Sequence, residues 1–124
     1  MIEELLLKAY IRSVGAYVPP KKISNDELAK TVDTSDEWIY SHTGIQNRHI
    51  AADEMAASDL AVKAAASALE KSDIKAKDID LILVATATPD FLGFPSTAAI
   101  VQDKIGASHA AAMDITAACT GFIY

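Results

Sequence analysis

The sequence predicts an α/β fold, and three observations carry this expectation. Extended apolar segments alternate with helical segments along the 124 residues, which is the pattern of parallel strands joined by right-handed crossovers. The segment 79–85 is almost continuously apolar, as expected for a strand buried on both faces of a parallel sheet. Hydrophobic residues make up 51% of the chain, which is a normal supply for a globular protein and excludes disorder as the main state.

The first third of the chain predicts one strand and two short helices. Residues 8–18 are rich in Ile, Val and Tyr and are expected to form the first strand. Asn25 is a suitable N-cap for a short helix, because acidic residues follow it in the first turn. Thr34 or Ser35 repeats this device for a second helix that runs to about His42. A Thr-Gly pair then ends that helix.

The clearest helix in the middle of the chain covers residues 58–71. Ser58 is its expected cap, and Asp59 and Lys63 are spaced to pair one turn apart on its surface. Alanine is abundant in this segment, which lets other elements pack close to the helix axis. Residues 45–50, ahead of it, predict a short extended piece.

Two strands and one helix are expected in the last third. The strand 79–85 is followed by a loop, and Pro95 is expected at the first position of a helix that runs through Ile105 and stops at Gly106. Residues 110–115 then predict another buried strand. The order of strand, helix and strand in this region is that of a parallel pair with its crossover.

Composition excludes several classes of function. The net charge of −6 comes with no basic stripe, which argues against nucleic-acid binding. No apolar run reaches the ~20 residues of a membrane helix, and the acidic start at residues 1–8 does not resemble a signal peptide, so a cytoplasmic protein is expected. The single cysteine, Cys119, and the spacing of His42, His49 and His109 match no metal motif, so no metal is expected.

The strongest chemical signal is the cysteine near the end of the chain. In residues 113–124 a predicted buried strand runs into small residues, then Cys119, and then Gly121. A tight turn there would place the thiol at the carboxyl end of a strand, where α/β sheets bind ligands. A helix starting at or just after Cys119 would favour its thiolate and supply amides for an oxyanion, as in a nucleophile elbow. The local pattern alone also fits a small buried hydrophobe.

Four segments resemble, in order, the N-terminal part of the β-ketoacyl-acyl-carrier-protein synthase III family. Together they spread the similarity over about residues 8–124. One such segment alone would be weak evidence, whereas four in the family's order are specific. The segments are Val32-Asp33-Thr34-Ser35-Asp36-Glu37-Trp38-Ile39, Thr43-Gly44-Ile45-Gln46-Asn47-Arg48-His49, Leu83-Val84-Ala85-Thr86-Ala87-Thr88-Pro89-Asp90 with Phe94-Pro95-Ser96, and Asp114 through Gly121-Phe122.

The resemblance implies a fold and an activity for the complete enzyme. Members of this family have the thiolase fold, two similar α/β halves in five layers (αβαβα), usually in a homodimer. They are acyltransferases of fatty-acid biosynthesis that use no permanently bound cofactor. A short acyl-CoA such as acetyl-CoA is a substrate, and its acyl group passes through a cysteine thioester to the carbanion left when malonyl-acyl-carrier protein loses CO₂.

Roles for five residues follow from the resemblance. Cys119 matches the family nucleophile, Trp38 the tryptophan that stacks on the adenine of CoA, and Thr34 a residue near the CoA nucleotide. Phe94 matches an aromatic that reaches across the dimer into the partner's acyl pocket. His42 departs from the arginine that is common in the family, and it is expected to flank the adenine with weaker CoA binding. From the residues alone, Trp38 also fits a partly buried packing residue, Thr34 an N-cap, and Phe94 hydrophobic packing before a helix.

The family's catalytic His and Asn match no residue here, and neither His49 nor His109 is expected to replace them. Residues 1–124 are therefore expected to be an incomplete N-terminal half of the enzyme, with the second half absent and no activity by themselves. Two alternatives remain open. One is a related starter-condensing synthase of polyketide or quinolone type, and the other is a non-catalytic fragment that serves as a folding or interaction unit.

Overall fold

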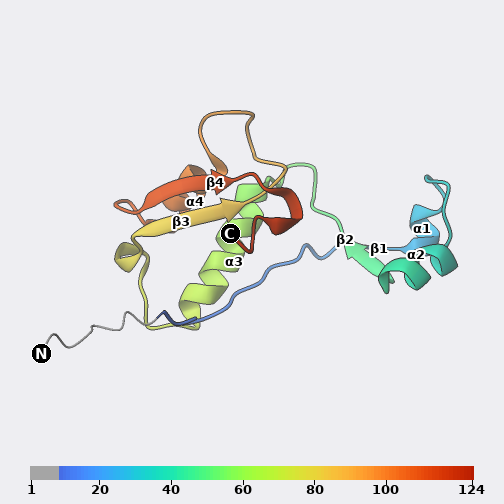
Figure 1. The fold of residues 1–124 in the computed structure, drawn as a ribbon, viewed down its shortest axis with the longest axis horizontal. Helices are drawn as coiled ribbons and strands as arrows, with labels where there is room; N and C mark the ends of the chain where they lie inside the picture. Colours follow the sequence, from blue (N-terminus) through green and yellow to red (C-terminus); the bar gives the residue numbers. More distant parts are fainter. Residues whose placement is uncertain (1–8) are drawn as a thin grey trace, which may run out of the picture.

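The computed structural model describes residues 9–124, which form an α/β structure with two separate two-stranded sheets (Figure 1). One sheet and two short helices come from the N-terminal third, and the other sheet is built with two longer helices. The described helices and strands are β1 (Lys22–Ser24), α1 (Asn25–Leu28), α2 (Asp36–Thr43), β2 (Asn47–His49), α3 (Ala57–Glu70), β3 (Leu81–Ala85), α4 (Thr97–Ile105) and β4 (Ala111–Ile115), with 3₁₀ turns at Ala76–Asp78 and Ala118–Thr120.

The larger unit confirms the predicted parallel pair and its crossover. Strands β3 and β4 are parallel, in a register that sets Leu81 opposite Ala111 and Ala85 opposite Ile115. Helix α4 joins them and packs on the sheet, and α3 packs against α4. Val101 in α4 is buried. Both strands therefore end at the same edge of the sheet, where the chain continues into the Cys119 turn (Figure 1).

The sheet differs from the prediction in one respect, because only one of its faces is covered. Leu81, Leu83 and Met113 are about half exposed, while the residues between them are partly buried. Asp114 bonds to the start of α4, so the α4 side of the sheet is the face that bears Asp114 and its neighbour across the register, Val84. A continuous apolar run was expected to be buried on both faces, but within the described residues the second face has no covering layer.

The smaller unit positions α2. Strands β1 and β2 pair antiparallel, which confirms the extended piece expected at residues 45–50. Ser35 caps α2 by accepting a hydrogen bond from the Trp38 amide at 3.1 Å, and Gly44 ends the helix in the left-handed region with φ of 69°. Helix α2 thus has the boundaries that its caps predicted.

Asn25 has a different role from the one expected. The cap of α1 is Ser24, whose hydroxyl accepts from the Glu27 amide at 3.1 Å. Asn25 is fully buried. Its side-chain nitrogen Nδ2 donates a hydrogen bond to Asp36 at 2.8 Å, and its side-chain oxygen Oδ1 accepts one from Arg48. This network ties α1, α2 and β2 together and satisfies the hydrogen-bonding groups of the buried side-chain amide.

The strand predicted at residues 8–18 is not formed within the described residues 9–18; Lys8 lies outside them. A strand requires backbone hydrogen bonds to a neighbour, and this segment contacts α3 instead. Ser13 donates to the Ala68 carbonyl at 2.8 Å, and Lys63 lies over the Tyr17 ring at 4.5 Å. The prediction of a strand was therefore wrong over residues 9–18, because a composition rich in Ile, Val and Tyr does not identify the surface on which the segment packs.

The two longer helices begin differently from the expectation. Helix α3 starts at Ala57 rather than at a Ser58 cap, and the Asp59 carboxylate accepts from the Ala56 amide at 3.0 Å. Asp59 pairs with Lys104 of α4 at 2.7 Å. Helix α4 starts after Ser96, which accepts from the Ala99 amide at 3.2 Å, so Pro95 precedes the helix and is not its first residue.

Within residues 9–124, every helix is too short or too polar to cross a lipid bilayer. The acidic segment 1–8, which was read as unlike a signal peptide, lies outside the described residues.

Candidate active site

Cys119 lies on a tight turn that directly follows β4. The turn is a single 3₁₀ turn, Ala118–Thr120, rather than the longer helix expected to start there. Its amides at Thr120 and Gly121 donate to the carbonyls of Ala117 and Ala118, both at 3.1 Å. Ala118 has a φ of 44°, which non-glycine residues rarely adopt and which costs of order 1 kcal/mol. This strained residue reverses the chain and presents the next side chain, Cys119, at the surface.

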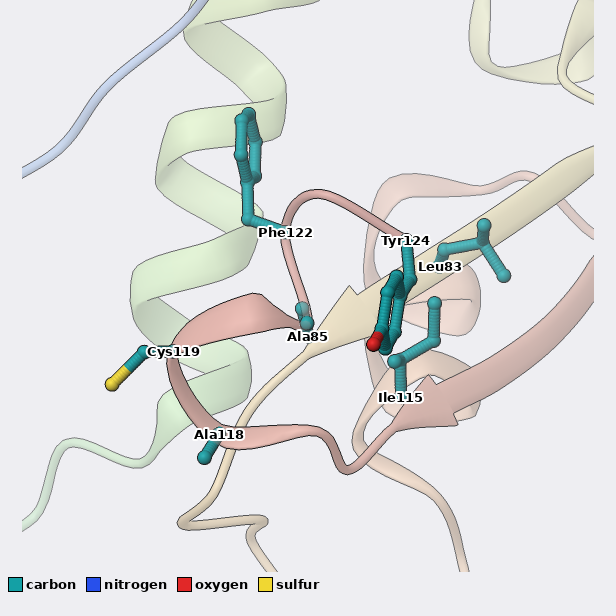
Figure 2. Close-up of a pocket in the computed structure, with 8 residues that line it drawn as sticks. Leu83, Ala85, Ile115, Ala118, Cys119, Phe122 and Tyr124 are labelled. Carbon is teal, nitrogen blue, oxygen red and sulfur yellow. The ribbon is translucent and has the colours of Figure 1, made fainter.

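The turn borders a cavity of about 400 Å³ at the carboxyl end of the sheet. Its floor is the open face of the sheet, to which the two strands contribute alternate apolar residues. In Figure 2 the Cys119 side chain points outward from the turn, while Tyr124 lies on the side of Ile115 and Leu83. The lining residues are Leu83, Ala85, Ile115, Ala118, Cys119, Gly121, Phe122 and Tyr124.

Most of this lining was not identified from the sequence. Leu83, Ala85 and Ile115 share one face because side chains alternate along a strand and the register sets Ala85 opposite Ile115. The alternation of side chains along each strand could have grouped these residues on one face. It was not used, because the strand 79–85 was expected to be buried on both faces. Gly121 fits the turn closely, since a Cβ there would lie 3.1 Å from the Ala85 Cβ.

A second cavity, of about 410 Å³, lies beside the start of α2. It is lined by Asp33, Thr34, Ser35 and Trp38. Thr34 Oγ1 is buried and has no hydrogen-bond partner among the described residues. An unsatisfied buried hydroxyl costs about 1–3 kcal/mol, and this one borders a cavity that could hold a polar ligand atom. Trp38 is 58% exposed, so its ring is available for stacking.

His42 lies one turn after Trp38 on α2 but does not line that cavity. The two rings are stacked, with centroids 4.4 Å apart and an angle of 20° between their planes. His42 Nδ1 is also 2.7 Å from the carbonyl oxygen of Trp38. The imidazole is therefore held against the indole ring by contacts within the helix.

The remaining candidates lie apart from both cavities. Phe94 is 96% exposed in the loop before α4 and lines neither cavity. His49 is held to the carbonyl of Pro19, and His109 Nε2 is 4.0 Å from Asp80 at the opposite end of the sheet from Cys119. Among the described residues no three His, Cys, Asp or Glu side chains are arranged to hold a metal ion.

The predicted site residues thus fall into three places. Thr34, Trp38 and His42 are together at α2, Cys119 is at the end of β4, and Phe94 is on an exposed loop. Chemically, the first place offers a stacking surface beside a buried hydroxyl, and the second offers an exposed thiol beside an apolar cavity.

Comparison with known proteins gives one consistent result. No family model matches the chain. It is 55% identical to β-ketoacyl-[acyl-carrier-protein] synthase III of Sulfurovum sp. strain NBC37-1 over 94% of this chain and 34% of that protein. Its identity to the Geobacillus kaustophilus protein of that name is 56%, over 94% of this chain and 37% of the relative.

Solved structures agree. The crystal structure of 3-oxoacyl-[acyl-carrier-protein] synthase III from Aquifex aeolicus matches with a TM-score of 0.85 and 46% identity, over 92% of this chain and 36% of that one. The priming β-ketosynthase of the R1128 polyketide pathway matches with a TM-score of 0.83 and 34% identity, over 90% and 33% of the two chains.

The chain spans about a third of the length of these relatives. Sequence identity and a shared thiolase fold extend over almost all of its residues. By sequence and by fold, the chain belongs, as a segment, to the β-ketoacyl-[acyl-carrier-protein] synthase III family of condensing enzymes.

Proposed function

We propose that this chain is the N-terminal, nucleophile-bearing segment of an acyltransferase that condenses an acyl-CoA primer with malonyl-acyl-carrier protein. The observation that carries the proposal is the exposed Cys119 on a strained turn after β4, beside an apolar cavity. The family relationship supports it, because the relatives are named β-ketoacyl-[acyl-carrier-protein] synthase III.

Cys119 carries the acyl group in this proposal. Its thiolate sulfur attacks the thioester carbonyl of the acyl-CoA, and the tetrahedral intermediate collapses as the C–S bond to CoA breaks. CoA leaves as its thiolate and takes up a proton, while the acyl group remains on Cys119 as a new thioester. Dividing the reaction at a covalent intermediate replaces one difficult step by two easier ones. The apolar cavity beside Cys119 suits the alkyl part of a short acyl group.

The second step forms the carbon–carbon bond. Malonyl-acyl-carrier protein loses CO₂, and the electron pair of the broken bond remains on the α-carbon. This carbanion attacks the Cys119 thioester carbonyl, and collapse of that intermediate expels the cysteine thiolate and gives the 3-oxoacyl product. The His and Asn that stabilise these charges in the family match no residue of this chain, so the segment by itself is proposed to be inactive in condensation.

The nucleotide of the acyl-CoA is proposed to bind at α2. Trp38 would stack on the adenine, and Thr34 would give the nucleotide a polar contact through its unpartnered Oγ1. The exposure of Trp38 and the cavity next to it support this assignment. No permanently bound cofactor is needed.

A homodimer of the complete enzyme is proposed, with Phe94 reaching into the partner's acyl pocket. The 96% exposure of Phe94, next to the 99% exposed Leu92, supports a loop that is covered by another surface.

The condensation itself gives the test. In the complete enzyme that includes this segment, acetyl-CoA and malonyl-acyl-carrier protein should yield CoA, CO₂ and the 3-oxoacyl product in equal amounts, and Cys119→Ala should abolish the product. The segment alone should give none. Product from the segment alone would contradict the proposed location of the other catalytic groups. Preference for another malonyl donor would instead favour the starter-condensing synthases of polyketide or quinolone pathways.

A further inference from the structure

The stacked pair on α2 constrains how a nucleotide can reach Trp38. The Trp38 and His42 ring centroids are 4.4 Å apart and their planes differ by 20°, which is the contact distance of two aromatic rings with nothing between them. Residues four apart lie on the same face of a helix. The contact is therefore set by the helix itself and covers one face of the indole ring.

A hydrogen bond fixes the imidazole in this position. His42 Nδ1 is 2.7 Å from the Trp38 carbonyl oxygen, and because a carbonyl oxygen only accepts, Nδ1 carries the proton and donates it. The Ser41 hydroxyl is a further neighbour of Nδ1, at 3.1 Å. Stacking and hydrogen bonding act together, so moving His42 away from Trp38 would break both.

A base cannot fit between these two rings. A flat ring between two others needs about 7 Å from plane to plane, twice the usual contact distance of about 3.5 Å. The cavity beside Trp38 is lined by Asp33, Thr34 and Ser35 and does not include His42. Thr34 is one of these lining residues, and its buried Oγ1 has no hydrogen-bond partner within residues 9–124.

We propose that His42 is a positioning residue that backs the Trp38 ring, and that the adenine stacks on the opposite ring face, above Thr34. This inference rests on the proposed function, since it assumes that CoA binds at α2. The order of the stack is His42, Trp38 and then the base. In this role His42 makes no contact with the ligand, and its stacking surface matters more than its charge. The position can therefore hold an imidazole without a permanent charge.

Nuclear Overhauser contacts test the order of the stack directly. The chain, labelled with ¹³C in histidine and tryptophan, is titrated with coenzyme A, and contacts among adenine, Trp38 and His42 ring protons are recorded. We expect the adenine protons to contact Trp38 but not His42, and the Trp38–His42 contacts to persist at saturation. His109 and His49 serve as internal controls that should contact neither ring.

Two other outcomes have distinct meanings. Contacts from adenine to both rings, with loss of the Trp38–His42 contacts, would overturn this inference and leave the proposed CoA site standing. Absence of any contact between adenine and Trp38 would overturn the proposed CoA site and this inference with it.

Variants at position 42 provide a second, independent readout. His42→Phe keeps the stacking surface and should leave the dissociation constant for coenzyme A within about twofold of the original value. His42→Ala removes the support and should weaken binding about two- to tenfold, the usual value of an aromatic pair. The matched control, His109→Ala, should have no effect. Equal weakening by His42→Phe and His42→Ala would contradict a role that depends on stacking.

Discussion

Cys119 differs from an ordinary packing cysteine in its exposure and in the backbone that precedes it. Small hydrophobes are normally buried, whereas this thiol is exposed and follows a residue with φ of 44°. Strained positions of this kind cost free energy and occur mainly where function maintains them. The sequence predicted the turn from its small residues, but it could not distinguish an exposed thiol from a buried one, because exposure depends on what the rest of the fold places nearby.

Alkylation separates the two readings of Cys119. Because the thiol is exposed, iodoacetamide should modify it in the folded chain at least as fast as in the urea-unfolded chain. The chain has one cysteine, so the mass of the intact protein reports this site alone. Strong protection in the folded chain would show that the thiol is buried by packing.

Gly15 allows the segment 9–18 to lie close against helix α3. A Cβ at this position would collide with the Ala64 carbonyl oxygen and the Ala68 amide, and would lie 2.9 Å from the Ala68 Cα. Gly15→Ala should therefore lower the free energy of unfolding by about 1–3 kcal/mol, measured by urea denaturation. Ala16→Ser, at the exposed neighbouring position, should be nearly neutral. A neutral Gly15→Ala would show that residues 9–18 do not pack on α3 as described.

At the scale of elements, aspartates that are distant in sequence accept hydrogen bonds from amides in the first turns of α3 and α4. Asp114 of β4 accepts from the amides of Thr97 at 2.8 Å and Ala98 at 2.7 Å, at the start of α4. Asp90 similarly accepts from the Ser58 amide in the first turn of α3, at 2.9 Å. The sequence predicted both helices but not these contacts, because a cap provided from a distant strand or loop leaves no signal next to the helix.

Removing the Asp114 carboxylate should loosen the link between β4 and α4. Two hydrogen bonds to a charged group are lost and two amides are left unpaired, so Asp114→Ala should cost about 2–3 kcal/mol of unfolding free energy. Asp53→Ala, at an exposed loop position, is the matched control and should change little. Equal stability of the two variants would rule out the capping role.

The pair between α3 and α4 gives a pH dependence. The hydrogen bond from Lys104, aided by one from the Ala56 amide, lowers the pKa of Asp59. A carboxyl whose pKa is lower in the folded state stabilises the fold above its unfolded pKa of about 4. That contribution is lost as the pH falls below this value towards the folded pKa. Asp59→Asn should therefore flatten the loss of thermal stability below about pH 4; an unchanged pH profile would contradict the pairing.

At the scale of the whole molecule, the sequence predicted features set by neighbouring residues, such as helix ends. It did not predict which surfaces pack against one another. The ends of α2 and α4 at Gly44 and Gly106 followed from residues next to the helices. The fate of residues 9–18 and the open face at Leu81 and Leu83 did not follow, because each depends on which surface lies opposite. The four segments that resemble the synthase III family predicted a specific fold. They did so where local patterns, such as the one around Cys119, allowed more than one interpretation.

Two features of the whole molecule concern the surroundings of Cys119: the length of the chain relative to its relatives and the uncovered face of the sheet. The chain spans about a third of the length of its relatives, and the cavity beside Cys119 is floored by the uncovered face of the sheet. The chain thus carries an exposed cysteine beside an apolar cavity and a stacked Trp38–His42 pair next to a second cavity, in two separate places.

The central claim is that Cys119 accepts an acyl group from CoA, and mass spectrometry of the complete enzyme that includes this segment, after incubation with acetyl-CoA, tests it most directly. The account predicts a mass increase of one acetyl group per chain, located on the peptide that contains Cys119, absent in Cys119→Ala and reversed by hydroxylamine at neutral pH, as for a thioester. An unmodified Cys119 at saturating acetyl-CoA, or an acetyl group located elsewhere, would contradict it.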